Sequence, residues 1–134
     1  MLLVPMVCLA LAGCSSVSTR QVMPLEQFPR IYVERRLNDN HYVDEVLVAE
    51  LRQMGFEASS GPRTLLPPDT DAVMTYDARW AWDFKTYLIE LNLEVHTYPA
   101  GKKLAEGRFH QPSLTTKSPP QVVRELLKSL YGRK

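Results

Sequence analysis

The segment 71–98 alternates apolar and polar side chains over almost its whole length, and this pattern constrains the fold more than any other feature of the chain. A period of two is typical of a β-strand that buries one face. We expect two long antiparallel strands that turn near Asp83-Phe84, because a turn there matches apolar with apolar residues along one face. The expected pairs are Trp80 with Tyr87, Ala78 with Ile89, Tyr76 with Leu91, and Met74 with Leu93. Other elements must cover an apolar face of this length.

The segments on either side of this hairpin contain two candidate helices. Apolar residues at helical spacing predict a helix over Tyr42–Met54, with an N-cap within Asn38–Asn40 and a C-cap at Gly55. A second helix is expected to open at Ser118–Gln121, where prolines suit the first turn and the serine and glutamine have the spacing of a capping box, and to end at Gly132. Each helix has one apolar stripe, so each should pack by one side.

Three shorter segments, 30–36, 56–60 and 103–111, have the composition of strands. The predicted order is therefore β-α-β-β-β-β-α, an α+β fold with a mostly antiparallel, twisted sheet and both helices on one face. The other face, which we call the open face, is expected to carry the polar residues of the hairpin. These are Thr75, Asp77, Arg79, Glu90, Asn92 and Glu94.

The first twelve residues, MLLVPMVCLALA, are uncharged and almost wholly apolar. They are too few to span a bilayer as a helix, but they have the length of the apolar core of a secretory signal, although no Lys or Arg precedes them. A buried N-terminal helix is the alternative, and Pro5 disfavours it. The sequence Leu11-Ala12-Gly13-Cys14 then resembles the lipobox of bacterial lipoproteins.

This resemblance implies that residues 1–13 are a signal peptide, that cleavage precedes Cys14, and that its sulfur carries a diacylglyceryl group, with further acylation giving stable anchoring. In sorted lipoproteins a serine such as Ser15 goes with delivery to the outer membrane, so we expect an outer-membrane anchor with the domain facing the periplasm. Residues 14–29 are expected to be the lipidated N-terminus and a flexible tether, and residues 30–134 a single domain. Together with the predicted topology, this layout resembles the envelope lipoproteins of the LptE, TolB N-terminal and CsgG type, which implies an envelope accessory factor.

Composition excludes several other classes. The formal net charge is +1 and the basic residues are scattered, which argues against nucleic-acid binding. Cys8 should leave with the signal peptide and Cys14 should carry lipid, so the sequence predicts neither a disulfide nor a cysteine metal site. Apart from the covalent lipid, no cofactor is expected. His41, His96 and His110 lack metal-ligand spacing, and Asp69 and Asp71 lack the rest of a calcium loop, so surface histidines and a plain turn are the favoured interpretations.

The candidate contact residues all lie on the hairpin. Asp77, Glu90 and Arg79 share the open face, where a solvated charge ladder is favoured over acid–base catalysis because a flat sheet lacks an enclosing cleft. Trp80 and Trp82 are most simply core residues, unless the strand extends beyond its helices and leaves a tryptophan as an anchor for a partner or an acyl chain. The leading hypothesis is a non-enzymatic lipoprotein that binds another envelope component. A lipid- or glycan-binding module using the two tryptophans is the alternative, and a hydrolase is disfavoured.

Overall fold

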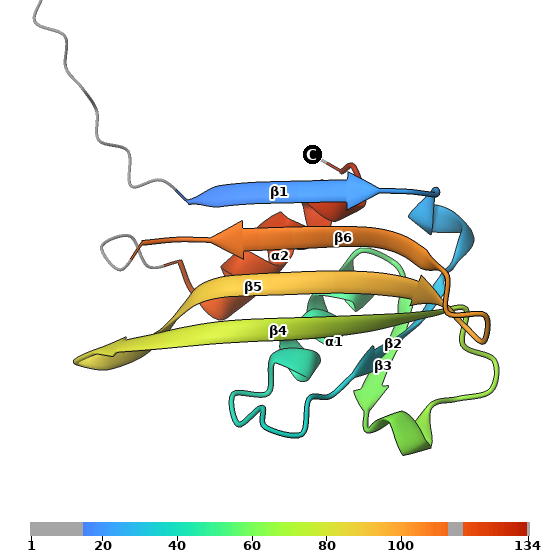
Figure 1. Cartoon of the computed structure of the whole chain (residues 1–134), viewed down its shortest axis with the longest axis horizontal. Coiled ribbons are helices and arrows are strands. Elements are labelled where there is room, and N and C mark those ends of the chain that lie inside the picture. The colour runs from blue at the N-terminus through green and yellow to red at the C-terminus, as the bar shows by residue number, and fades with distance from the viewer. Residues whose placement is uncertain (1–14, 113–116, 134) are drawn as a thin grey trace, which may run out of the picture.

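The computed structural model describes residues 15–112 and 117–133, which form a six-stranded mixed sheet with two helices packed on one face (Figure 1). The strands lie side by side in the order β1-β6-β5-β4-β2-β3. Pairings of β2 with β3 and with β4 are parallel and the other three are antiparallel, so the predicted α+β class and mostly antiparallel sheet are confirmed. The strands are β1 (Ser16–Gln21), β2 (Arg30–Glu34), β3 (Glu57–Gly61), β4 (Ala72–Asp83), β5 (Lys85–Thr97) and β6 (Lys103–His110), and the helices are α1 (Val43–Gln53) and α2 (Pro119–Leu130).

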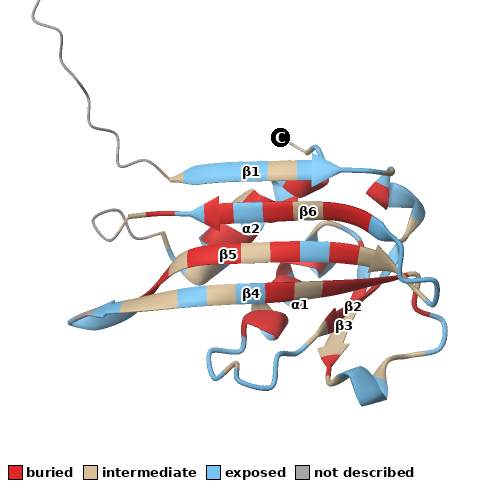
Figure 2. Cartoon of the chain, viewed as in Figure 1, coloured by how far each residue is buried: buried red, intermediate tan, exposed pale blue. Residues whose placement is uncertain are grey.

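The hydrophobic core fills the space between the sheet and the two helices. Burial alternates along β5 and β6, and it is almost complete on the sheet face that the helices cover (Figure 2). The apolar stripes of both helices are buried there, as the helical spacing predicted. The largest fully buried side chains are Phe109, Leu25, Leu47, Leu51, Met74, Leu88, Leu91, Leu93, Leu104, Leu126, Leu127 and Leu130.

The β4–β5 hairpin turns where the sequence predicted, but its predicted register is wrong by two residues along the inner part of the ladder. Asp83 pairs with Lys85, which leaves Phe84 alone at the turn, and a β-bulge between Arg79 and Trp80 leaves Ile89 unpaired. Each irregularity shifts the register by one residue. The observed pairs are therefore Trp80 with Leu88, Ala78 with Leu91, Tyr76 with Leu93, and Met74 with Val95.

The bulge also explains which residues of β5 face the helices. Leu88 and Leu91 are both fully buried although they are three residues apart, a spacing that an uninterrupted strand would place on opposite faces. The extra residue in the bulge brings both onto the helix side. Simple alternation predicted that Tyr87 and Leu91 share a face, but the bulge places them on opposite faces of the sheet.

Strand β1 is a correction to the predicted tether. Residues 14–29 were expected to be flexible, but Ser16–Gln21 pairs antiparallel with β6 along its whole length, from Ser16 opposite His110 to Gln21 opposite Ala105. The domain accordingly starts well before residue 30. The segment contributes backbone pairing more than apolar burial, since only Thr19 in it is not exposed. Its composition therefore gave no hydrophobic signal.

The ends of the helices agree with the predictions in part. The N-cap of α1 is Tyr42, in the left-handed conformation and without a side-chain cap, so the prediction of an N-cap within Asn38–Asn40 is wrong. Asp39 nevertheless satisfies the first N–H of the helix, because its Oδ2 accepts the N–H of Val43 at 3.0 Å. Gly55 adopts φ 96°, as a helix C-cap glycine does. The capping box predicted for α2 is wrong, because the side chain of Ser118 makes no capping hydrogen bond, although prolines do occupy the first turn.

Candidate binding surface

The far end of the β4–β5 hairpin, residues 82–86, extends beyond the rest of the sheet, and we call it the hairpin tip (Figure 1). Pairing of β5 with β6 ends at Glu90 and His110, so β4 and β5 continue past this level as a two-stranded arm. Trp82 is 74% exposed and Phe84 is 94% exposed at its end, with ring centroids 6.4 Å apart. The structure thus places Trp82 beyond the cover of the helices.

Trp80 lies in a different environment from Trp82. It is half-buried against the core, and its indole stacks on the imidazole of His41, with ring centroids 4.0 Å apart and an interplanar angle of 16°. Trp80 therefore fixes the loop that precedes α1 onto β4. The two tryptophans that the sequence grouped together have separate roles, one internal and one at the surface.

The open face carries the polar residues that the sequence assigned to it. The register sets Thr75 opposite Glu94, Asp77 opposite Asn92, and Arg79 opposite Glu90. Asp77 pairs with the guanidinium of Arg36 from the loop after β2, at 3.3 Å. The open face thus carries a row of polar side chains that includes two separate ion pairs, Arg36 with Asp77 and Arg79 with Glu90.

Glu90 lies between two arginines and is only 4% exposed. Arg79 on β4 donates to its Oε2 at 3.1 Å, and Arg108 on β6 pairs with its Oε1. Burial acts to raise the pKa of Glu90, but the charges and hydrogen bonds of Arg108 and Arg79 outweigh it, so the pKa lies below its ordinary value. A carboxylate held ionised by two arginines is a poor proton donor near neutral pH, and this geometry favours a structural ion pair.

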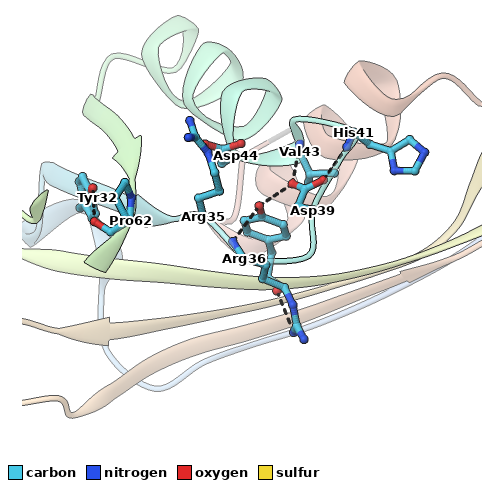
Figure 3. Close-up of polar contacts among 9 residues, drawn as sticks. Tyr32, Arg35, Arg36, Asp39, His41, Val43, Asp44 and Pro62 are labelled. Atoms are coloured by element: carbon cyan, nitrogen blue, oxygen red, sulfur yellow. Dashed lines mark hydrogen bonds and ion pairs between the residues drawn. The ribbon is translucent and has the colours of Figure 1, made fainter. Parts of the chain in front are cut away.

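A second polar network joins the loop before α1 to β4 (Figure 3). Tyr76 Oη donates to Asp39 Oδ2 at 2.5 Å and accepts the backbone N–H of Arg36 at 3.2 Å. Burial acts to raise the pKa of Asp39, but hydrogen bonds from Tyr76 and from the N–H groups of His41 and Val43 bring it below its ordinary value. Burial, followed by the bond to Asp39, raises the pKa of Tyr76 well above its usual range, so the phenol remains a donor. The network holds the loop in place by ordinary structural contacts.

The acidic and histidine residues that the sequence analysis considered as metal ligands do not gather into one site. Asp69 and Asp71 both face Arg30, which pairs with the carboxylate of Asp69 at 3.7 Å and donates its backbone N–H to Asp71 at 3.0 Å. His96 lies 3.8 Å from Glu94 on the open face. Within residues 15–112 and 117–133, no three His, Cys, Asp or Glu side chains gather in a way that would hold a metal ion.

Cys14 and the predicted signal peptide lie outside the described residues. In the part of the chain that the structure covers, neither helix has the length and apolar character needed to cross a bilayer.

Two residues at the candidate surface, Phe84 and Arg108, were missed by the sequence analysis. Phe84 follows directly after the alternating pattern, and Arg108 required the register of β6.

Comparison with known proteins supports the fold alone. No protein-family model matches the chain, and neither does any curated protein. The chain is similar in structure to PelC from Paraburkholderia phytofirmans, which was solved as a dodecamer both as a point variant and without that substitution. The TM-score is 0.67 for each structure, and the alignments cover 90% of this chain and 100% of the PelC chain. Sequence identity is 11% to the point variant and 12% to the other form. A minor lipoprotein from Acinetobacter baumannii aligns over 76% of this chain and 87% of its own with 16% identity, but its TM-score of 0.39 is too low to support an argument.

Proposed function

We propose that this chain is a lipid-anchored protein of the bacterial envelope that catalyses no reaction and acts by binding another envelope protein along the edge of β1. The observation that carries the proposal is the position of this strand. β1 lies at one end of the strand order and pairs on one side with β6, so its outer backbone edge has no strand partner within the described residues. Such an edge accepts an added strand through main-chain hydrogen bonds.

The opposite edge of the sheet is less suited to this role. β3 has five residues and is followed at once by Pro62, and a short edge next to proline limits further pairing. β1 contains no proline and has β-branched residues at Val17 and Thr19, which favour extended pairing. It also begins two residues after Cys14, so a lipid there would hold this edge close to the membrane.

Photo-cross-linking in intact cells tests the proposal. A photoreactive residue at Ser18, which is exposed on β1, should give a discrete adduct with one envelope protein, whereas the same residue at Glu57 on β3 should not. Cys14→Ser should remove the chain from the membrane fraction and abolish the adduct. Because the two PelC structures are dodecamers, an adduct of twice the mass of the chain would identify a second copy as the partner. Equal labelling at both positions, or a monomer without adducts at either, would count against binding at this edge.

A second candidate function, contact with a lipid or glycan, has separate support in the exposure of Trp82 at the hairpin tip. Aromatic side chains with a polar group suit both kinds of ligand. The exposed Phe84 next to it, which offers no hydrogen bond, favours a lipid.

A further inference from the structure

We propose that the hairpin tip inserts Trp82 and Phe84 into the surface of the same bilayer that holds the lipid on Cys14, so that the domain is attached at two points. The proposal rests on the lipid anchor proposed above and adds a second, non-covalent membrane contact. The partner that the hairpin tip contacts is thus a lipid bilayer and not a second protein.

The two features lie at the same end of the sheet (Figure 1). Ser16, the first residue of β1, pairs with His110; His110 pairs with Glu90; and Glu90 pairs with Arg79. This chain of pairs places Ser16 and Arg79 at the same level along the strands. From that level β4 runs four residues further to Asp83, in the direction from which the N-terminal segment enters the sheet.

Strand geometry gives the distances that matter. Four residues at about 3.3 Å each extend the tip roughly 13 Å beyond the level of Ser16. The two residues from Cys14 to Ser16 span at most about 7 Å even when fully extended. The tip therefore reaches at least as far outward as Cys14. Three strand spacings of about 4.8 Å separate β1 from β4, so the start of β1 and the hairpin arm are about 14 Å apart across the sheet.

The chemistry of the tip suits the interface of a bilayer. Trp82 and Phe84 are two of the most exposed large apolar side chains in the described part of the protein. Tryptophan is favoured at the level of lipid headgroups because its ring is apolar and its N–H needs a polar partner. The charges of Asp83 and Lys85 offset one another, so the tip has no net charge and its affinity for a bilayer would come from the two aromatic rings.

The backbone at the tip gives a second, independent observation. Phe84 has φ 60°, in the left-handed region where glycine or asparagine fits more easily than an aromatic residue. The chain thus holds a bulky apolar side chain, 94% exposed, at a turn position that disfavours it. Strain of this kind concentrates at functional positions, and here it turns an aromatic ring outward from the end of the arm.

Tryptophan fluorescence of the full-length, lipidated protein tests the inference, because the chain has only two tryptophans. Trp80→Phe leaves Trp82 as the sole reporter, and Trp82→Phe leaves Trp80. Each variant is reconstituted into vesicles of phosphatidylethanolamine and phosphatidylglycerol, with and without lipids brominated in the upper acyl chain. We expect the emission of Trp82 to shift to the blue and to be quenched by bromine, whereas Trp80, stacked on His41, should be quenched severalfold less.

A matched pair of variants controls for the membrane contact itself. Phe84→Asn suits the left-handed turn and should leave the fold intact while reducing the quenching of Trp82. Val22→Ser removes a 54% exposed apolar side chain directly after the C-terminal end of β1, away from the hairpin tip, and should leave the quenching unchanged.

The outcomes separate this inference from the proposed function. If the chain floats with vesicles but the emission of Trp82 remains that of an indole in water, the tip contact is wrong and the lipid anchor stands. A blue shift without bromine quenching would mean that protein covers the tip, which also overturns the inference. A chain that carries no lipid on Cys14 and fails to float overturns both proposals.

Discussion

Replacing Gly61 with alanine should destabilise the domain by about 1–3 kcal/mol, because a methyl carbon there would lie 2.6 Å from Oη of Tyr32. Tyr32 has little room to move. Its side chain is 2% exposed, and Oη donates to the carbonyl oxygen of Pro62 at 2.7 Å. The new methyl group would therefore push against a ring that packing and a hydrogen bond both hold.

The contact predicts that a second substitution relieves the first. Tyr32→Phe alone should cost about 1 kcal/mol through loss of the hydrogen bond to Pro62. It also removes the oxygen, and the nearest remaining ring atom, Cζ, is 3.6 Å from the position of the methyl carbon, an ordinary van der Waals distance. In the Tyr32→Phe background, Gly61→Ala should therefore cost at least about 1 kcal/mol less than in the wild type. The backbone cost of φ 159° at Gly61 is the same in both backgrounds and cancels in the comparison.

Urea unfolding of the four proteins measures this coupling, provided that the slope m stays the same. Gly101→Ala is the control, because Gly101 has φ 72° and no atom within 4 Å of the position of a Cβ, so its cost should add to that of Tyr32→Phe. If the free energies of Gly61→Ala and Tyr32→Phe add within about 0.3–0.5 kcal/mol, the steric reasoning is refuted.

Four further substitutions test other contacts. Asp39→Ala should cost about 1–2 kcal/mol, because it removes the hydrogen bonds that Asp39 accepts from the N–H of Val43 and from Tyr76. Since the pKa of Asp39 is lowered in the fold, the wild type should hold additional stability above about pH 4 and lose it on acidification. Urea unfolding at pH 7 and pH 3 should show that the variant lacks this dependence. Trp80→Ala should cost about 2 kcal/mol and Trp82→Ala less than about 0.5 kcal/mol in thermal unfolding, and equal losses would contradict their different burial. Arg124→Ala should lower the unfolding midpoint, because it leaves the buried carboxylate of Glu50 without the two 3.1 Å hydrogen bonds that join α2 to α1. A midpoint unchanged from that of the wild type would mean that this ion pair contributes nothing to stability.

The sequence predicted most of the fold because periodic burial is a local property of the chain. Alternation over 71–98 and the helical spacing in 42–54 identified the elements, and they identified the covered faces except at the start of β5, where Leu88 and not Tyr87 faces the helices. Strand β1 was missed because an edge strand is held by backbone pairing to β6, a residue-independent interaction that leaves no apolar pattern. The register of the hairpin was missed because a bulge depends on which of several apolar residues packs best against the helices, which is a tertiary choice.

The candidate surface was only partly predictable for the same reason. Asp77, Arg79 and Glu90 share a face by alternation alone, so sequence sufficed to place them together. The second arginine on Glu90, Arg108, comes from β6, and its position follows from a strand register that composition does not specify. The exposure of Trp82 depends on how far the helices extend along β4, and the sequence left both possibilities open.

The pairing of the first strand with the last one ties the two ends of the domain together. β1 lies beside β6 and above α2, where Thr19 Oγ1 is 2.8 Å from Ser129 Oγ and Gln21 donates to the carbonyl of Leu130 at 3.2 Å. These contacts join residues more than 100 positions apart, so they form only when nearly the whole chain is present. During synthesis, the segment that emerges first must wait for the one that emerges last. A chain held at its N-terminus by lipid would thus complete its sheet only after the final helix has followed it across the membrane.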